Sequence, residues 1–98
     1  MKQVKTLPGV VLISVCDEHI LVATREARKK VPYVRQINSA GGFYWSLLEK
    51  GIDPNEIIRQ AAVKYQIPGK QAAAMVVSFV NKLYKAGYVT VQDVEESK

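Results

Sequence analysis

The fold is most constrained by the segment from Ile37 to Gly51, where an extended run gives way to a short helix. Asn38 or Ser39 can cap this helix, because a short polar side chain accepts a hydrogen bond from a free amide of the first turn. Glycine at the end of the segment is a common helix stop. One face of the predicted helix is apolar at helical spacing and carries Phe43, Leu47 and Leu48.

Two further helices are predicted after this one. The first spans Asp53 to Tyr65, with Asp53 as its cap and Pro54 at its first position. Pro68-Gly69 then breaks the chain, and the last helix runs from Lys70 to Ala86 before Gly87.

Three strands are predicted ahead of the helices: Val10–Val15, Ile20–Thr24 and Val31–Ile37. The polar residues Cys16 to His19 form a connection of hairpin length between the first two. Pro32 cannot donate to a strand ladder, so the third strand is expected at an edge of the sheet. Unpaired backbone groups at such an edge are either shielded or used to bind an added strand. The fold class is therefore α+β, with an N-terminal three-stranded antiparallel sheet followed by three helices.

The length of 98 residues predicts a single domain, residues 1–98, with an ordered core of about 8–91 and disordered ends at Met1–Thr6 and Gln92–Lys98. The longest apolar run, Val10 to Ile13, is far shorter than the ~20 residues of a membrane span. Met1 is not followed by the apolar segment of a signal peptide. A cytoplasmic protein that makes no contact with membranes is the default expectation.

Positive charge is concentrated in one segment. The net charge is +5, and five basic residues lie between positions 25 and 35: Arg25, Arg28, Lys29, Lys30 and Arg35. Such a cluster attracts nucleic acid, acidic lipid or an acidic peptide, and charge alone does not choose among them. A solvated basic loop without a partner is an equally good interpretation.

The last helix is apolar over an unusually wide arc. At 100° per residue its apolar side chains cover roughly 200°, where a surface helix needs little more than 100°. The excess lies on one of two flanks, either Ala73, Val77 and Tyr84 or Met75 and Ala86. Either a small core buries the whole arc, or one flank faces a binding groove.

No catalytic or metal-binding constellation can be built from this sequence. His19, the only histidine, falls in a predicted turn, and a nucleophile–base pair with Cys16 would lack an orienting group. A single cysteine excludes an internal disulfide and a multi-thiolate metal site. Gly41-Gly42 lacks the spacing and the lysine of a phosphate-binding loop. The chain is therefore expected to be neither an enzyme nor a cofactor-binding protein, and Trp45 is expected in or near the core.

The order of these motifs resembles the PqqD-like family, the precursor-peptide recognition elements of ribosomally synthesised, modified peptide (RiPP) biosynthesis. The resemblance covers about residues 8–91. It is carried by the three strands followed by Ile37-Asn38-Ser39-Ala40, Trp45, Leu47-Leu48, Gly51, Asn55-Glu56-Ile57-Ile58, Phe79-Val80-Asn81-Lys82-Leu83 and Gly87-Tyr88-Val89.

The resemblance implies a winged helix-turn-helix-like fold and a non-catalytic peptide chaperone. Such a protein binds the leader of a precursor peptide as a strand added to the third strand, in the groove between that strand and the third helix. It then presents the leader to a modifying enzyme, such as a radical SAM enzyme, a leader protease or a cyclase. On this chain the resemblance implies a peptide-binding set of Tyr33, Val34, Arg35, Gln36, Ile37, Ala73, Val77, Val80 and Tyr84. The family has no fixed basic motif, so the steering of an acidic leader by Arg25, Arg28, Lys29 and Lys30 is an expectation from the charge of this chain alone.

Two alternatives stay open at this point. The positive charge and the helix–turn–helix rhythm around Tyr65 to Gly69 also suit a winged-helix DNA-binding transcription regulator. The predicted recognition helix then begins with only two base-reading side chains, Lys70 and Gln71, so nucleic acid fits less well. The second alternative is a homodimer formed through the exposed edge strand.

Overall fold

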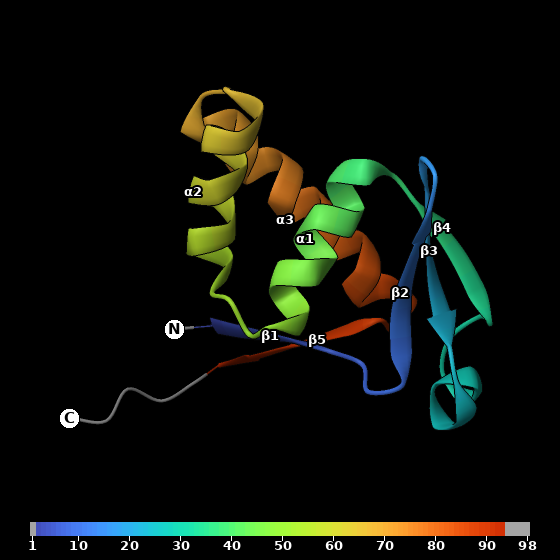
Figure 1. Ribbon diagram of the computed structural model, residues 1–98. Coiled ribbons are helices and arrows are strands. Elements are labelled where there is room, and N and C mark those ends of the chain that lie inside the picture. Colours follow the sequence, from blue (N-terminus) through green and yellow to red (C-terminus); the bar gives the residue numbers. More distant parts are fainter. Residues whose placement is uncertain (1, 94–98) are drawn as a thin grey trace.

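The computed structural model describes residues 2–93 and has an α+β fold with two antiparallel sheets and three helices (Figure 1). The larger sheet has the order β2-β3-β4, formed by Val10–Val15, Glu18–Ala23 and Val34–Ile37. The α+β class, the three-stranded sheet and the edge position of its third strand are confirmed. The helices lie on one side of this sheet (Figure 1).

The hairpin between β2 and β3 is tighter than the sequence suggested. Val15 pairs with Glu18, so the loop consists of Cys16 and Asp17 alone, with Cys16 at φ 55°. Positive φ is typical of two-residue hairpin loops. The placement of His19 in the turn was therefore wrong. His19 lies within β3, half-buried, and its ring nitrogens lie 2.7 Å from Ser14 Oγ and 3.3 Å from Ser39 Oγ.

The basic segment between β3 and β4 is a short 3₁₀ helix, η1 (Arg25–Lys29), where a loop was expected. Thr24 anchors its start by donating from its backbone amide and from Oγ1 to the Gly9 carbonyl, at 2.8 and 2.6 Å. Ala27 is buried beneath it. The strand that follows begins at Val34, three residues later than predicted.

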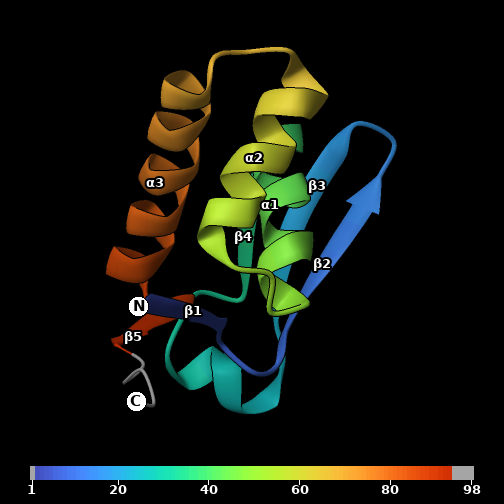
Figure 2. The same ribbon diagram turned by 90° about the vertical axis from the view of Figure 1, so that its left-hand side faces the viewer.

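The two ends of the described chain pair with each other, which the sequence did not reveal. β1 (Lys2–Thr6) and β5 (Val89–Asp93) form a two-stranded antiparallel sheet in which Val4 faces Val91. The expectation that residues 2–6 and 92–93 are disordered was therefore wrong, while residues 1 and 94–98 lie outside the described part. Figure 2 shows this sheet at the C-terminal end of α3.

The three helices begin and end close to the predicted residues. They are α1 (Ser39–Glu49), α2 (Pro54–Tyr65) and α3 (Gly69–Ala86). The side chain of Asn38 caps α1 by accepting from the Gly41 amide at 2.7 Å, and Asp53 accepts from the Asn55 amide at 2.7 Å. Gly87 ends α3 at φ 91°, a backbone conformation that favours glycine.

Close packing explains the glycine pair in the first turn of α1. A Cβ at position 41 would lie 2.8 Å from the Phe79 ring of α3, and one at position 42 would lie 3.3 Å from the His19 ring of β3. The missing side chains thus let α1 approach both neighbours, at a cost in helix propensity of about 1 kcal/mol per glycine.

The core lies where α1 meets the sheet and the other two helices. Trp45 is fully buried, as expected, and its Nε1 donates to Glu49 Oε2 at 3.1 Å. The largest fully buried side chains around it come from every layer of the fold: Leu21, Ile57, Val76, Leu83, Tyr88 and Val89. This core holds β4 and α3 in fixed positions on either side of the start of α1.

Candidate binding groove

The outer edge of β4 offers unpaired backbone groups. The Ala23 amide of β3 donates to the Tyr33 carbonyl at 2.8 Å, so the backbone groups of Tyr33 point toward β3. In an antiparallel ladder these groups alternate in direction from residue to residue. Arg35 and Ile37 therefore also point toward β3, whereas Val34 and Gln36 direct their amides and carbonyls away from it. Within residues 2–93, no strand pairs with this edge.

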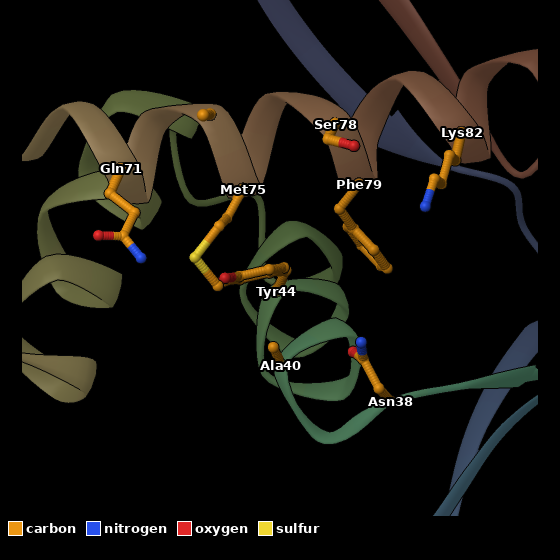
Figure 3. Close-up of a pocket in the computed structure, with 9 residues that line it drawn as sticks. Asn38, Ala40, Tyr44, Gln71, Met75, Ser78, Phe79 and Lys82 are labelled. Atoms are coloured by element: carbon orange, nitrogen blue, oxygen red, sulfur yellow. The ribbon is translucent and has the colours of Figure 1, made fainter. Parts of the chain in front are cut away.

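A groove separates this edge from α3 and continues along the seam between α1 and α3. The part beside β4 is a hollow of about 190 Å³ lined by Arg35, Gln36, Ile37, Asn38, Phe79, Lys82 and Leu83. The part beyond the end of β4 has about 390 Å³ and is lined by Asn38, Ala40, Tyr44, Gln71, Ala74, Met75, Ser78, Phe79 and Lys82 (Figure 3). Three residues, Asn38, Phe79 and Lys82, line both parts, so the two hollows form one continuous surface.

The floor of the groove is apolar and rigidly packed. The rings of Tyr44 and Phe79 meet edge to face with centroids 5.4 Å apart. Phe79 also abuts Gly41, where no side chain separates the two helices. Met75 lies beside Tyr44 and is 36% exposed (Figure 3). Apolar side chains of an extended segment along this floor would lose contact with water, which favours their binding.

One buried polar group in the groove has no partner. The hydroxyl of Tyr44 makes no hydrogen bond within residues 2–93, although its side chain is 2% exposed. Burial, and to a lesser extent the nearby Tyr65, raises the pKa of Tyr44, so the hydroxyl stays protonated at neutral pH. An unpaired buried hydroxyl is energetically costly. Its oxygen is covered, so a ligand in the groove pairs with it only by displacing a neighbouring side chain.

The rim of the groove is positively charged. The guanidinium of Arg35 lies 5.6 Å from the centre of the Tyr88 ring, and Lys82 lines both hollows. Burial raises the pKa of Tyr88, and the neighbouring Arg35 charge opposes that rise. None of the residues that line the two hollows is acidic. The charge of this rim therefore suits a ligand with carboxylate groups.

The apolar wall inferred from the sequence lies on the other flank of α3. Val77 and Tyr84 are two and five residues from Phe79, so at 100° per residue they point about 160° and 140° away from it. They are 50% and 54% exposed, and Ala73 and Val80 lie on the same flank, half-buried. The structure thus does not bring these four residues to β4. It brings the Met75 flank there, because Val76 and Leu83, between the two flanks, turn inward to the core.

The basic residues proposed for steering lie in and just after η1. Arg28 stacks on the Tyr33 ring at 4.3 Å and its Nε donates to the Ala23 carbonyl at 3.2 Å, so it supports the start of β4. Lys29 forms an exposed ion pair with Glu26 at 3.3 Å. Arg25 and Lys30 are exposed. The cluster is thus partly used to position the edge strand.

Residues 2–93 hold no group of three or more potential metal ligands. Within the same residues, no helix is long and apolar enough to cross a membrane.

Comparison with known proteins identifies relatives of this fold. The profile of a family described as coenzyme PQQ synthesis protein D (PqqD) matches residues 18–89, which include both sides of the groove. No sequence among the curated proteins matches the chain.

Two solved structures share the fold. One is TbiB1 in complex with the TbiA(beta) leader peptide, with 22% identity, a TM-score of 0.71, and coverage of 87% of this chain and 93% of that chain. The other is lasso peptide synthetase B1 complexed with the leader peptide, with 15% identity, a TM-score of 0.72, and coverage of 90% and 98%. Neither the family nor these structures supports the DNA-binding alternative.

Proposed function

We propose that this chain, which belongs to the PqqD family, is a non-catalytic chaperone for the leader segment of a ribosomally made precursor peptide. The leader adds as a strand to the free edge of β4 and lies in the groove against α3. The chain then presents the bound peptide to a modifying enzyme, a radical SAM enzyme or a leader protease or cyclase.

The observation that carries this proposal is the position of an unpaired strand edge beside an apolar groove. The outward amides and carbonyls of Val34 and Gln36 can form hydrogen bonds with the backbone of any extended peptide. The groove then selects among peptides by their side chains. Both similar structures are complexes with leader peptides. The peptide-binding set that we propose keeps Tyr33–Ile37 and replaces the predicted wall by residues that line the groove: Asn38, Tyr44, Met75, Phe79 and Lys82.

Strand addition can be tested by amide hydrogen exchange. The leader segment of a candidate precursor peptide, chosen from the genes that flank this one, would be added to the isotope-labelled chain. We expect the Val34 and Gln36 amides to become protected from exchange, because a new strand would engage them. The Arg35 and Ile37 amides should change little, since β3 already holds them. Unchanged exchange at Val34 and Gln36 at saturating leader would contradict the proposal.

A pair of proline variants provides the matched control. Gln36→Pro removes an outward amide from the β4 edge without removing a bond to β3, and proline is tolerated on such edges. By the same alternation, Ser14→Pro removes an outward amide from the opposite edge of the sheet, on β2. Leader affinity should fall at least tenfold for Gln36→Pro and stay within twofold for Ser14→Pro. Thermal unfolding of both variants would show that they remain folded.

A further inference from the structure

The three-stranded sheet has a second face that is apolar and open to water. In register across the sheet, Val22 of β3 lies between Val11 of β2 and Val34 of β4, and Ile13 lies beside Ile20. Val15 extends the first of these strands toward the hairpin. Val11, Ile13, Val15 and Val34 are 47%, 40%, 63% and 48% exposed. We call this set of six residues, Val11, Ile13, Val15, Ile20, Val22 and Val34, the outer face.

This exposure runs against the usual pattern of a solvated sheet. Strands with one face in water normally alternate apolar and polar residues, whereas strands that are apolar on both sides are covered on both. The sequences of β2 and β3 follow the second pattern, since Val10, Leu12, Leu21 and Ala23 fill the inner face. No helix or strand within residues 2–93 covers the outer face, and all three helices lie on the opposite side (Figure 1). Contiguous apolar patches of this kind mark interaction sites.

The charge next to the outer face indicates the kind of partner. η1 follows β3 and precedes β4, so its exposed basic side chains lie at one end of the sheet (Figure 1). A second copy of the chain would bring the same net charge of +5, which opposes association. The hairpin end of the sheet is acidic instead, because Asp17 and Glu18 are exposed there and Glu18 pairs with Val15. A protein surface complementary to this face is therefore apolar, with carboxylates where it meets η1 and basic groups where it meets the hairpin.

The outer face is also continuous with the proposed leader site. Val34 belongs to both, because its backbone lies on the free edge of β4 and its side chain lies on the outer face. A leader strand added to β4 would direct every second side chain to the outer face, beside Val34. The face would then be made by protein and peptide together, whereas the groove side chains of the leader would remain hidden against α3.

We infer that the outer face, extended by the bound leader, is the docking surface for the enzyme that modifies the precursor peptide. The inference rests on the proposed leader-binding function. An enzyme that docks there contacts the bound leader as well as the chain, so it distinguishes the leader-loaded chain from the free chain. The leader stays in the groove while the enzyme is bound. Reciprocity then requires that the leader strengthens enzyme binding by the same factor as the enzyme strengthens leader binding.

A double variant of β2 tests the docking surface. Val11→Ser/Val15→Ser removes apolar area from the outer face at positions remote from the β4 edge. Val63→Ser/Val77→Ser is the matched control, because these two valines are 70% and 50% exposed on α2 and α3. The probe is the purified modifying enzyme encoded beside the precursor-peptide gene, and its affinity would be measured with and without the leader.

We expect the enzyme to bind the leader-loaded chain at least tenfold more tightly than the free chain. The β2 variant should lose at least tenfold of that affinity, as loss of two valine contacts implies, while the control variant stays within twofold. Leader affinity in the absence of enzyme should be equal for both variants and the unmodified chain.

Other results overturn the inference in ways that can be told apart. If the leader binds and the β2 variant recruits the enzyme normally, or the enzyme does not bind at all, docking at the outer face is wrong and leader binding stands. If the leader does not bind the unmodified chain, both proposals fail. Sedimentation that shows a dimer sensitive to the β2 variant would assign the face to a second copy. Binding to vesicles of anionic lipid with the same sensitivity would assign it to a membrane.

Discussion

The two flanks of α3 are similar in composition and differ in what faces them. The Met75 flank, with Phe79 and Lys82, closes a groove against β4 and α1. The Val77 flank, with Tyr84, is more exposed, and the hollow of about 440 Å³ that Val77 lines is formed by α3 residues, with no contribution from β4 or α1. Exposed apolar area is therefore a poor guide to a binding site on this helix. The site is set by the juxtaposition of apolar side chains with an open strand edge.

The largest difference in leader affinity between the two flanks is expected when an aspartate is introduced on each. Met75→Asp puts a charge on the groove floor beside Tyr44, where a bound leader would bury it at a cost of at least about 2 kcal/mol. Leader affinity should fall about 30-fold or more, measured by isothermal titration calorimetry. Val77→Asp makes the same addition to the other flank and should change affinity less than twofold. Equal losses in the two variants would remove the distinction between the flanks.

The contact between α1 and the groove flank can be broken at one glycine. Gly41→Ala places a Cβ 2.8 Å from the ring of Phe79, which lines both hollows of the groove and must shift to make room. The gain in helix propensity, about 1 kcal/mol, offsets part of the strain, so the free energy of unfolding should change by no more than about 1 kcal/mol. Leader affinity should fall about tenfold because the displaced ring occupies the groove. Affinity equal to that of the unmodified chain would show that Phe79 moves elsewhere.

The unpaired hydroxyl on the groove floor should affect stability and binding in opposite directions. Tyr44→Phe removes a buried group without a partner, so the free energy of unfolding should rise by about 1 kcal/mol in chemical denaturation. Leader affinity should fall about fivefold, because the hydroxyl can no longer bond to the peptide. Tyr84→Phe, on the other flank, is the control and should leave both quantities unchanged. A stabilised variant with full affinity would show that the leader does not use the hydroxyl.

The smallest expected effect comes from charge. Lys82→Gln and Lys85→Gln change the net charge equally, but only Lys82 lines the hollows beside β4. For an acidic leader, affinity should fall about threefold for Lys82→Gln and less for Lys85→Gln. The difference should shrink as NaCl is raised, since salt screens exposed charges. A difference that persists at high salt would assign the effect of Lys82 to packing of its stem.

The elements of the fold were largely predictable because their signals are local. Pro32 before the third strand marked an edge, and Asp53-Pro54 and Gly87 marked helix ends within a few residues. The β1–β5 sheet was missed because each strand buries few side chains, chiefly Val4 and Val89. Its pairing joins opposite ends of the chain, and such a contact leaves no periodic pattern in either segment.

Only the strand side of the candidate site was predictable, because it depends on local signals in the sequence, whereas the helix side depends on tertiary packing. The edge position of the strand that ends at Ile37 was predictable, because a proline beside a strand favours an edge. The sequence by itself determined the order of the three sheet strands and the three helices, the edge and the width of the apolar arc on α3. Only the tertiary structure decided which flank of that arc meets the edge, because helical periodicity gives relative angles and no absolute orientation. Packing of α3 through Val76 and Leu83, and the close approach of Gly41 to Phe79, fixed that orientation.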